Sequence, residues 1–423
     1  MRLFVDDIDD PWSDSRYKDT ILKNSELHMQ QQQQLSLPKP DDLSVAHSAR
    51  VAAFIRERID AAGGEISFAE YMHHALYAPG LGYYNAGATK FGKAGDFITA
   101  PETSAIFGRI IALQCAQVLS QVNAASILEL GAGSGKLAAD IMLLLAERDA
   151  LPPEGYQILE VSADLRERQQ SYLRSELPEL STRVTWVEQL PDAFTGIIIA
   201  NEVLDALPVE RFVRRGDKLC QVCVTRREDR FNLCEREAPE NLQAAVGAIE
   251  TALGNKLPDG YSSEVCTAAP PWVSDLAGTL HEGAILLFDY GVSQREYYSP
   301  ERSGGWLRCH FRHHAHNDPL LLPGIQDITS WVDFSAVAAA AVTAGLDILG
   351  YVSQAQFLIA GGLDKLLGDF SELPVSAQLE LSAQVKLLTL PAEMGENFKC
   401  IGLSRGELDV PSAFGLADRT SFL

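Results

Sequence analysis

The stretch ILELGAGSGKLAAD, residues 127–140, decides the fold of this chain. The apolar run at residues 126–130 is typical of a strand buried on both faces, and it stops at Gly131. A helical pattern follows, with apolar residues three and four positions apart. Gly131, Gly133 and Gly135 allow positive φ angles in the turn between them, and they lack the Cβ atoms that would keep a ligand off the backbone. The stretch therefore predicts a strand, a turn on which a ligand can lie, and a helix.

The spacing of the glycines indicates which ligand this is. A dinucleotide-binding turn has its third glycine three positions after the second, where this chain has Lys136. Glu129 precedes the turn, and a carboxylate at this place would repel a pyrophosphate but attract an α-ammonium group. This pattern favours S-adenosylmethionine (SAM), which carries ammonium and sulfonium charges and no phosphate. A tight connection that binds no ligand is the alternative.

Length, charge and cysteine content exclude several classes of protein. The chain has 423 residues and 46% hydrophobic content, enough for one large or two ordinary globular domains. A formal net charge of -22 argues against a nucleic-acid backbone as the partner and favours a basic protein segment. The seven cysteines, an odd number, suit a reducing compartment better than a disulfide framework. No apolar run reaches the roughly twenty residues of a membrane-spanning helix, so we expect no membrane insertion.

Residues 1–45 are expected to form a disordered acidic tail. They combine an aspartate-rich beginning with a glutamine run at residues 30–34, and neither a signal peptide nor an arginine-rich transit peptide fits this composition. We therefore expect a cytoplasmic protein of bacterial type. The mitochondrial matrix would apply only to a eukaryotic source, and the acidic beginning disfavours it.

Strands and helices alternate after the glycine-rich turn, which predicts an α/β fold. Further strands are expected at residues 156–161, 184–187, 196–200, 284–290 and 347–351, with a last strand within 396–406 that pairs antiparallel with the one before it. A helix is expected from about Glu102 and a long loop after Tyr290. The expected regions are an N-terminal helical and lid region at 46–126, a core at 127–206 and 284–405, an insertion with hairpin strands at 207–283, and a C-terminal tail at 406–423.

Acidic and amide side chains at the tips of the second and third core strands are candidates for nucleoside binding. Glu160 ends the second strand, where a carboxylate can accept hydrogen bonds from both ribose hydroxyls. The alternative is a surface glutamate that caps the next helix. Glu188 and Gln189 follow the third strand, where they could meet the adenine amino group.

Polar residues after the fourth and fifth core strands are candidates for substrate binding and catalysis. Asn201, Glu202 and Asp205 follow the fourth strand, at the sheet edge where open α/β folds bind ligands. If a helix begins here, its first turn brings the two carboxylates to one side, and they can hold a guanidinium group. The alternative is that they favour the helix N-terminus. Asp289 ends the fifth strand, and His310 in the loop beyond it is a second catalytic candidate.

A glycine-rich loop at residues 92–101 leads into a helix, as lids and ligand clamps often do, although a plain connector fits equally. Its candidate substrate or lid residues are Gly95, Asp96, Phe97, Thr99, Pro101 and Glu102. Cys220 and Cys223 form an isolated C-x-x-C pair, and no second pair lies at metal-binding spacing, so we predict no metal site.

Eight blocks of sequence together resemble the MidA family of SAM-dependent methyltransferases, over about residues 46–405. They are LELGAGSGKL, LEVSADLRERQ, ANEVLDALPVERF, GDFITAPE, LLFDYG, LRCHFRHH, LPGIQDITSWVDFS and EMGENFKC. The resemblance implies the class I seven-strand, Rossmann-like methyltransferase fold, SAM as methyl donor, and a family that includes the mitochondrial assembly factor of respiratory complex I. For that member it implies symmetric dimethylation of a protein arginine. By position, Gly131, Gly133 and Gly135 would contact the methionine part of SAM, and Glu160 its ribose.

The expected reaction is direct methyl transfer to a guanidinium nitrogen of a protein arginine, and a respiratory dehydrogenase subunit is a candidate target. Glu202 and Asp205 would orient the guanidinium, and Asp289 or His310 would take the proton late. A non-catalytic assembly chaperone that binds SAM and a small-molecule methyltransferase are the two alternatives.

Overall fold

The computed structural model describes residues 37–86, 99–368 and 370–423. The chain divides into two compact units, Met1–Pro40 and Asp41–Leu423, and every helix and strand of the described residues lies in the second. Most of the expected tail, together with Gly95, Asp96 and Phe97 of the expected lid, lies outside the described residues. Residues 42–45, which were expected to belong to the tail, form the first turn of helix α2 (Asp42–Ala61).

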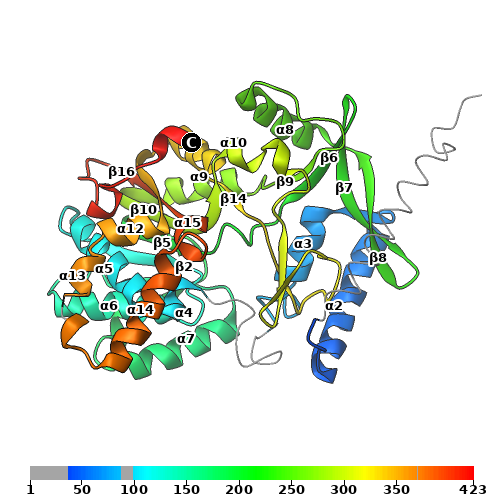
Figure 1. The fold of residues 1–423 in the computed structure, drawn as a ribbon. Coiled ribbons are helices and arrows are strands. Elements are labelled where there is room, and N and C mark those ends of the chain that lie inside the picture. Colours follow the sequence, from blue (N-terminus) through cyan, green and yellow to red (C-terminus); the bar gives the residue numbers. More distant parts are fainter. Residues whose placement is uncertain (1–36, 87–98, 369) are drawn as a thin grey trace, which may run out of the picture. The chain divides into compact units, whose positions relative to one another are not determined.

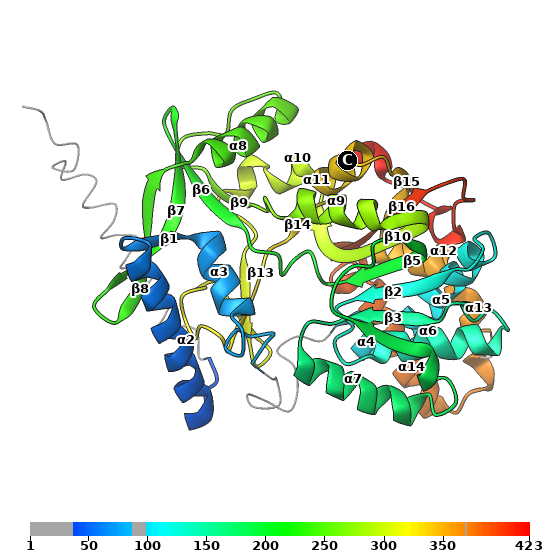
Figure 2. The same ribbon diagram turned by 180° about the vertical axis from the view of Figure 1, so that it is seen from behind.

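A mixed sheet forms the core (Figures 1 and 2). Its strands lie in the order β15-β16-β10-β5-β2-β3-β4, and β14 pairs with β10. Their bounds are β2 (Ser126–Leu130), β3 (Tyr156–Leu159), β4 (Val184–Val187), β5 (Phe194–Asn201), β10 (Leu280–Val292), β14 (Val332–Asp333), β15 (Asp347–Ser353) and β16 (Phe398–Arg405). Strand β16 runs antiparallel to both of its neighbours, whereas β4, β3, β2, β5 and β10 run parallel to one another. The prediction of a seven-strand α/β sheet whose last strand is antiparallel to the one before it is confirmed.

Successive residues of the central strands pack into two different apolar layers, because side chains alternate between the faces of a sheet. Ile127 packs with the helices α5 and α6, whereas Leu128 packs with α9 and α11. The main helices of the core are α5 (Ala105–Leu119), α6 (Lys136–Glu147), α7 (Ala163–Glu176), α9 (Ala269–Thr279), α11 (Phe334–Thr343), α12 (Gln354–Ala360) and α14 (Val375–Thr389). Shorter ones are α4 (Ala100–Thr103), α10 (Gln294–Tyr297), α13 (Leu363–Leu366) and α15 (Met394–Asn397). Helices therefore cover both faces of the sheet, as its continuous apolar strands require.

The helix expected from about Glu102 is in fact two helices. Ser104 has an extended backbone (φ -162, ψ 140), which ends α4, and its side chain caps α5 by accepting from the N–H of Ile106. The apolar residues that predicted the helix, Ile106, Ile110 and Leu113, all lie in α5.

A second sheet combines the insertion with the N-terminal region. Its strands lie in the order β1-β7-β6-β9, with β8 paired to β7. The bounds are β1 (Glu65–Ser67), β6 (Glu210–Arg215), β7 (Lys218–Arg227), β8 (Arg230–Glu237) and β9 (Ser262–Val265). The chain turns at Gly216 (φ 55) between β6 and β7, which pair antiparallel. Helices α2 and α3 (Phe68–Tyr77) share an apolar cluster with this sheet, and α8 (Glu240–Leu253) shares another.

The stretch after β10 is not the long loop that the sequence suggested. It contains a small sheet in the order β12-β11-β13, with β11 (Arg308–Phe311), β12 (His314–His316) and β13 (Asp327–Thr329). Ile328 of β13 belongs to the apolar cluster of α2 and α3. Among the described residues, no helix is long and apolar enough to cross a membrane.

The close approach of β2, β5 and β10 depends on two strand glycines. At Gly196 (φ +129) a Cβ atom would lie 2.0 Å from the carbonyl oxygen of Ser126, and at Gly283 (φ +132) it would lie 1.9 Å from that of Gly196. Both positions therefore exclude any side chain.

We predict that Gly196→Ala lowers the free energy of unfolding by about 3 kcal/mol or more, because the backbone of β2 must move. Gly247→Ala is the matched control: it lies within helix α8, where a Cβ meets nothing within 4 Å, and it should raise stability by about 0.5–1 kcal/mol. Denaturant unfolding measures both variants. Similar midpoints for the two variants would contradict the argument.

Candidate active site

The glycine-rich turn after β2 is open at its centre. Gly131, Gly133 and Gly135 have φ angles of 65, 54 and 88 degrees. A Cβ on Gly133 would meet nothing within 4 Å, whereas one on Gly135 would lie 3.6 Å from atoms of Tyr172 and Leu173. Gly135 thus allows helix α7 to pack closely, while Gly133 faces free space. A ligand can lie against the backbone at Gly133, as the sequence predicted for this turn.

Gln169 links Glu160 to this turn by hydrogen bonds. Oε2 of Glu160 accepts from Nε2 of Gln169 at 3.0 Å, and the same nitrogen also donates to the carbonyl oxygen of Gly133 at 3.0 Å. Oε1 of Glu160 accepts from the N–H of Ser162, the N-cap of α7, at 2.9 Å. Glu160 therefore lies beside the glycine turn and supports the start of α7, but with 6% of its surface exposed it is buried and is not the surface glutamate of the alternative interpretation. The sequence analysis missed Gln169, a fully buried polar residue of α7.

Glu129 is buried at the end of β2, and only 2% of its surface is exposed. The hydroxyl of Tyr156 donates to its Oε2 at 2.8 Å. Burial raises the pKa of Glu129 to about 7, although the hydrogen bond from Tyr156 acts in the opposite direction. A cationic group near Glu129 would favour the ionised form.

The residues after β4 are exposed. Glu188 forms an ion pair with Arg166 at 3.2 Å, and Gln189 lies next to it on the surface. Arg166 also donates to the carbonyl oxygen of Glu160 at 3.0 Å. This chain of contacts places the tip of β4 beside the tip of β3, where the nucleoside was expected.

Residues 99–102 are the part of the expected lid that the structure describes, and they lie against both the glycine turn and the loop after β5. Thr99 precedes α4, whose first turn contains Pro101 and Glu102. Glu102 accepts a hydrogen bond from the hydroxyl of Ser134 in the glycine turn. The backbone N–H of Ala100 lies near enough to the carboxylate of Glu202 to lower its pKa, although burial raises it overall. Helix α4 therefore bridges the glycine turn and the loop after β5.

The expected helix start at residues 201–206 is wrong. Asn201 is the last residue of β5, and residues 202–206 form a loop in which Glu202 has a positive φ of 53 degrees. Asp289 holds the loop: its Oδ2 accepts from the N–H groups of Leu204 and Asp205 at 3.0 and 3.1 Å. The N–H of Tyr290 donates to its Oδ1 at 2.9 Å. No helix follows β5 before the next strand, and the left-handed backbone of Glu202 is not helical, so a role for Glu202 and Asp205 at a helix N-terminus is excluded.

Glu202, Asp205 and Asp289 form a carboxylate cluster at the edge of the sheet. Asp205 is only 5% exposed; one oxygen accepts from the hydroxyl of Tyr290, and Oδ1 has no partner among the described residues. Asn201 donates to Glu202 at 3.2 Å, and its own buried oxygen also lacks a described partner. In the described part of the chain, no Lys or Arg forms an ion pair with any of the three carboxylates. The cluster can therefore accept a cationic ligand.

The electrostatics of the carboxylate cluster agree with this geometry. Burial raises the pKa of Asp205 to about 6. Burial, followed by the charge of Asp205, also raises the pKa values of Glu202 and Asp289 well above the ordinary range. Since like charges in a desolvated place disfavour each other, a bound cation would stabilise the ionised cluster.

His310 lies on β11, where its Cα pairs with that of Asp327 on β13. Burial lowers the pKa of His310, with smaller contributions from His316 and Arg308. The imidazole is therefore neutral at pH 7. The structure places it on the small sheet rather than in direct contact with the carboxylate cluster.

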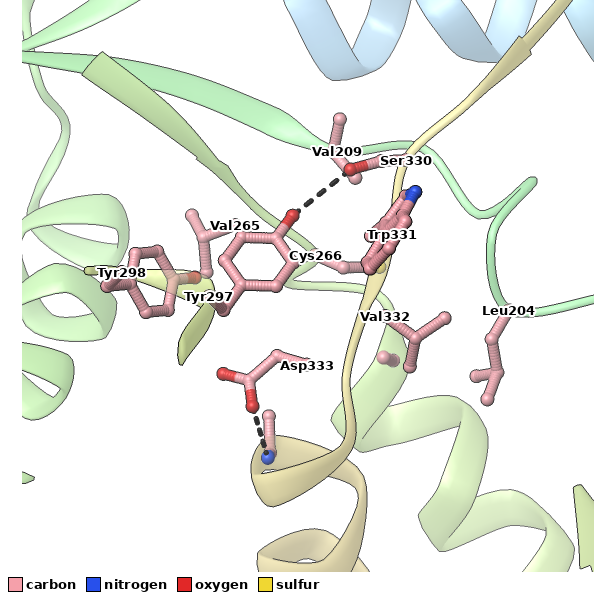
Figure 3. Close-up of a pocket in the computed structure, with 12 residues that line it drawn as sticks. Leu204, Val209, Val265, Cys266, Tyr297, Tyr298, Ser330, Trp331, Val332 and Asp333 are labelled. Carbon is pink, nitrogen blue, oxygen red and sulfur yellow. Dashed lines mark hydrogen bonds between the residues drawn. The ribbon is translucent and has the colours of Figure 1, made fainter. Parts of the chain in front are cut away.

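A small cavity lies behind the loop that carries the carboxylate cluster (Figure 3). Leu204 and Trp331 line it, and the hydroxyls of Tyr297 and Ser330 are 3.1 Å apart within it. The N–H of Ser330 donates to the carbonyl oxygen of Asp205 at 2.9 Å. The cavity wall and the carboxylate cluster are thus joined by the backbone.

The chain is similar to several known proteins. Residues 110–352 match the family model described as "Putative S-adenosyl-L-methionine-dependent methyltransferase". The protein arginine methyltransferase NDUFAF7 of Danio rerio, a mitochondrial protein, is 31% identical over 80% of this chain and 83% of its own length. The homologue of Drosophila melanogaster is 29% identical over 82% of this chain and 83% of its own length.

A solved structure from Burkholderia thailandensis, bound to S-adenosyl-homocysteine, is also similar. It has 39% sequence identity and a TM-score of 0.85, and the match covers 92% of this chain and 100% of that chain. The family match, the curated relatives and this fold confirm the resemblance that the sequence blocks carried. This chain therefore belongs to the family of S-adenosyl-L-methionine-dependent methyltransferases, and SAM is its cofactor.

Proposed function

We propose that this chain is a protein arginine N-methyltransferase that dimethylates its target symmetrically and acts in the assembly of respiratory complex I. The observation that carries the proposal is the buried carboxylate cluster, in which Oδ1 of Asp205 lacks a described partner, close to an open glycine turn. Relatives named as protein arginine methyltransferases support it. A guanidinium group is a cation that two carboxylates can hold by paired hydrogen bonds.

Donor binding is assigned to residues on the tips of β2 to β5. Gly131, Gly133 and Gly135 would contact the methionine part, Glu129 would favour the α-ammonium group from a distance, and Glu160 would accept from the ribose hydroxyls. The outer positions Glu188 and Gln189 would face the adenine, and the unpaired oxygen of Asn201 would accept from a donor on the ligand. The free space at Gly133 supports this assignment, because a ligand can approach the backbone there.

In the proposed mechanism the carboxylate cluster orients the target. SAM, when bound, supplies a methyl group on a positively charged sulfur. Glu202 and Asp205 would hold the guanidinium so that one nitrogen faces the donor, and most of the rate gain would come from this positioning. Asp289 would act as a positioning residue, because its oxygens accept from backbone N–H groups of the loop.

As the new N–C bond forms and the S–C bond breaks, the attacking nitrogen loses one proton. We assign this proton to Asp205, whose raised pKa of about 6 makes it a stronger base than an ordinary carboxylate. His310 is the second candidate, since its lowered pKa keeps it neutral and able to accept.

The target is proposed to be a protein segment in a reducing compartment such as the cytoplasm. The formal charge of -22 would attract a basic segment. All seven cysteines are free thiols, as expected where disulfides do not form.

We predict that Gly133→Ala abolishes measurable SAM binding, because its Cβ would occupy the space assigned to the methionine part. Gly216→Ala is the matched control: the two glycines have φ angles of +54 and +55, and at both a Cβ meets nothing within 4 Å. Backbone strain is therefore the same in both variants, and only Gly133→Ala should lose binding. Calorimetric titration with SAM measures this, and equal affinities would refute the assignment.

We predict that Asp205→Asn lowers methyl transfer by about a hundredfold or more while SAM affinity stays within about twofold. The amide keeps the shape of the side chain but removes the charge that holds a guanidinium. The measurement is transfer of labelled methyl from SAM to proteins of a lysate, followed by mass spectrometry for symmetric dimethylarginine. A labelled product that is free of methylated arginine, or a fully active Asp205→Asn variant, would contradict the proposal.

Activity should depend on pH through Asp205. Its pKa in the folded protein is about 6, so the carboxylate is neutral at pH 5 and ionised at pH 7. We predict that kcat/KM for an arginine peptide falls roughly tenfold per pH unit below 6, and that peptide binding at pH 6 releases protons. Calorimetry in buffers of different ionisation enthalpy measures the release. In Asp205→Asn the release should be smaller.

A further inference from the structure

Two tyrosines of the N-terminal region lie against the loop that carries the carboxylate cluster. Tyr77 ends α3, and its hydroxyl donates to the carbonyl oxygen of Ala206 at 3.0 Å. Tyr84 lies in the turn after α3, and its hydroxyl donates to Oδ1 of Asp327 at 2.9 Å. The two rings are stacked, with centroids 5.4 Å apart and an interplanar angle of 26 degrees. An aromatic wall therefore stands beside Asp205.

Asp327 extends the negative charge of the carboxylate cluster to β13. It is 9% exposed and lies in a different segment of the chain from the other carboxylates. Asp205 and Asp327 both raise the pKa values of Tyr77 and Tyr84, and Asp327 also contributes to the raised pKa of Glu202. The stacked tyrosines connect Asp327 with the loop that carries Asp205, because Tyr84 binds Asp327 and Tyr77 binds Ala206.

A flat, delocalised cation fits such surroundings better than a compact one. A guanidinium group is weakly hydrated, stacks on aromatic faces and forms forked hydrogen bonds with carboxylates. The ammonium group of lysine is a strongly hydrated point charge, and it gains less from a ring beside it. The unpaired and buried Oδ1 of Asp205 is the acceptor that such a ligand would use.

We propose that Tyr77, Tyr84 and Asp327 form the outer part of the target site and select arginine over lysine. This assignment rests on the proposed arginine-directed function and adds binding residues from two segments outside the core sheet. The outer face of this stacked pair of rings would cover one face of the guanidinium, while Asp205 and Asp327 would accept from its edge. The hydroxyls of the tyrosines hold this arrangement by their bonds to Ala206 and Asp327.

The first experiment uses the wild-type protein saturated with S-adenosyl-homocysteine. N-acetyl-arginine methylamide and N-acetyl-lysine methylamide are titrated separately, and binding is followed by NMR. We expect the arginine probe to bind at least about fivefold more tightly, in line with the gain from stacking and forked hydrogen bonds. Equal affinities, or tighter binding of the lysine probe, would overturn the proposal without any variant.

The second experiment compares Asp327→Asn, Tyr84→Leu and Tyr84→Phe. Asp327→Asn and Tyr84→Leu should each lower the preference for arginine by roughly three- to tenfold, while Tyr84→Phe keeps the ring and should lose less. SAM affinity should be unchanged in all of them. The charge control is Asp347→Asn, at the exposed start of β15, which should keep the wild-type preference.

A purely structural role for these residues gives a different result. If Tyr84 and Asp327 only fasten the N-terminal region to the core, the variants lower the melting temperature but leave the ratio of arginine to lysine affinity unchanged, which would overturn the proposal. Arginine binding that depends on Asp327, without transfer to any protein, would remove the proposed catalytic function and leave this site standing.

Discussion

The carboxylate of Asp289 holds the substrate side of this molecule together. It is completely buried, and such a charge is unfavourable unless hydrogen bonds satisfy it. Three backbone N–H groups do so, two from the loop after β5 and one from its own strand. These bonds hold the loop in place, and they fix Asp205 where its Oδ1 has no partner among the described residues. Without Asp289, the loop after β5 would lose the hydrogen bonds that position the carboxylate of Asp205.

The two halves of the site differ in how far apart their residues lie in the sequence. The donor side consists of the glycine turn, Glu160 and Gln169, which lie within one strand-turn-helix unit and its neighbour. Such local patterns report a ligand-binding turn directly. The acceptor side joins segments that are 129 and 243 residues apart, through the hydroxyls of Tyr77 and Tyr84. Periodicity cannot show such pairs, so the sequence analysis could name Glu202 and Asp205 as candidates but not the tyrosines and Asp327, which we propose as part of the acceptor side.

The difference between local and distant contacts also explains which helices and strands the sequence predicted well. The strands of the central sheet were found because continuous apolar runs are buried on both faces. The helix expected at Glu202 was wrong: this residue has a left-handed backbone, and a local pattern of acidic residues cannot show the loop's contacts with Asp289. The long loop expected after β10 hides the small sheet of β11 to β13, whose strands have three or four residues and are too short for alternation to be recognised.

The raised pKa values of Glu202, Asp205 and Asp289 point to binding rather than to stability. A group of buried carboxylates destabilises the folded state as pH rises through their pKa values, because the unfolded chain ionises them more easily. No described Lys or Arg forms an ion pair with these three to offset that cost. A fold built only for stability would have replaced these residues with apolar ones. A cation bound at this cluster would instead pair with the ionised carboxylates. The free energy of that pairing would contribute to binding of the target.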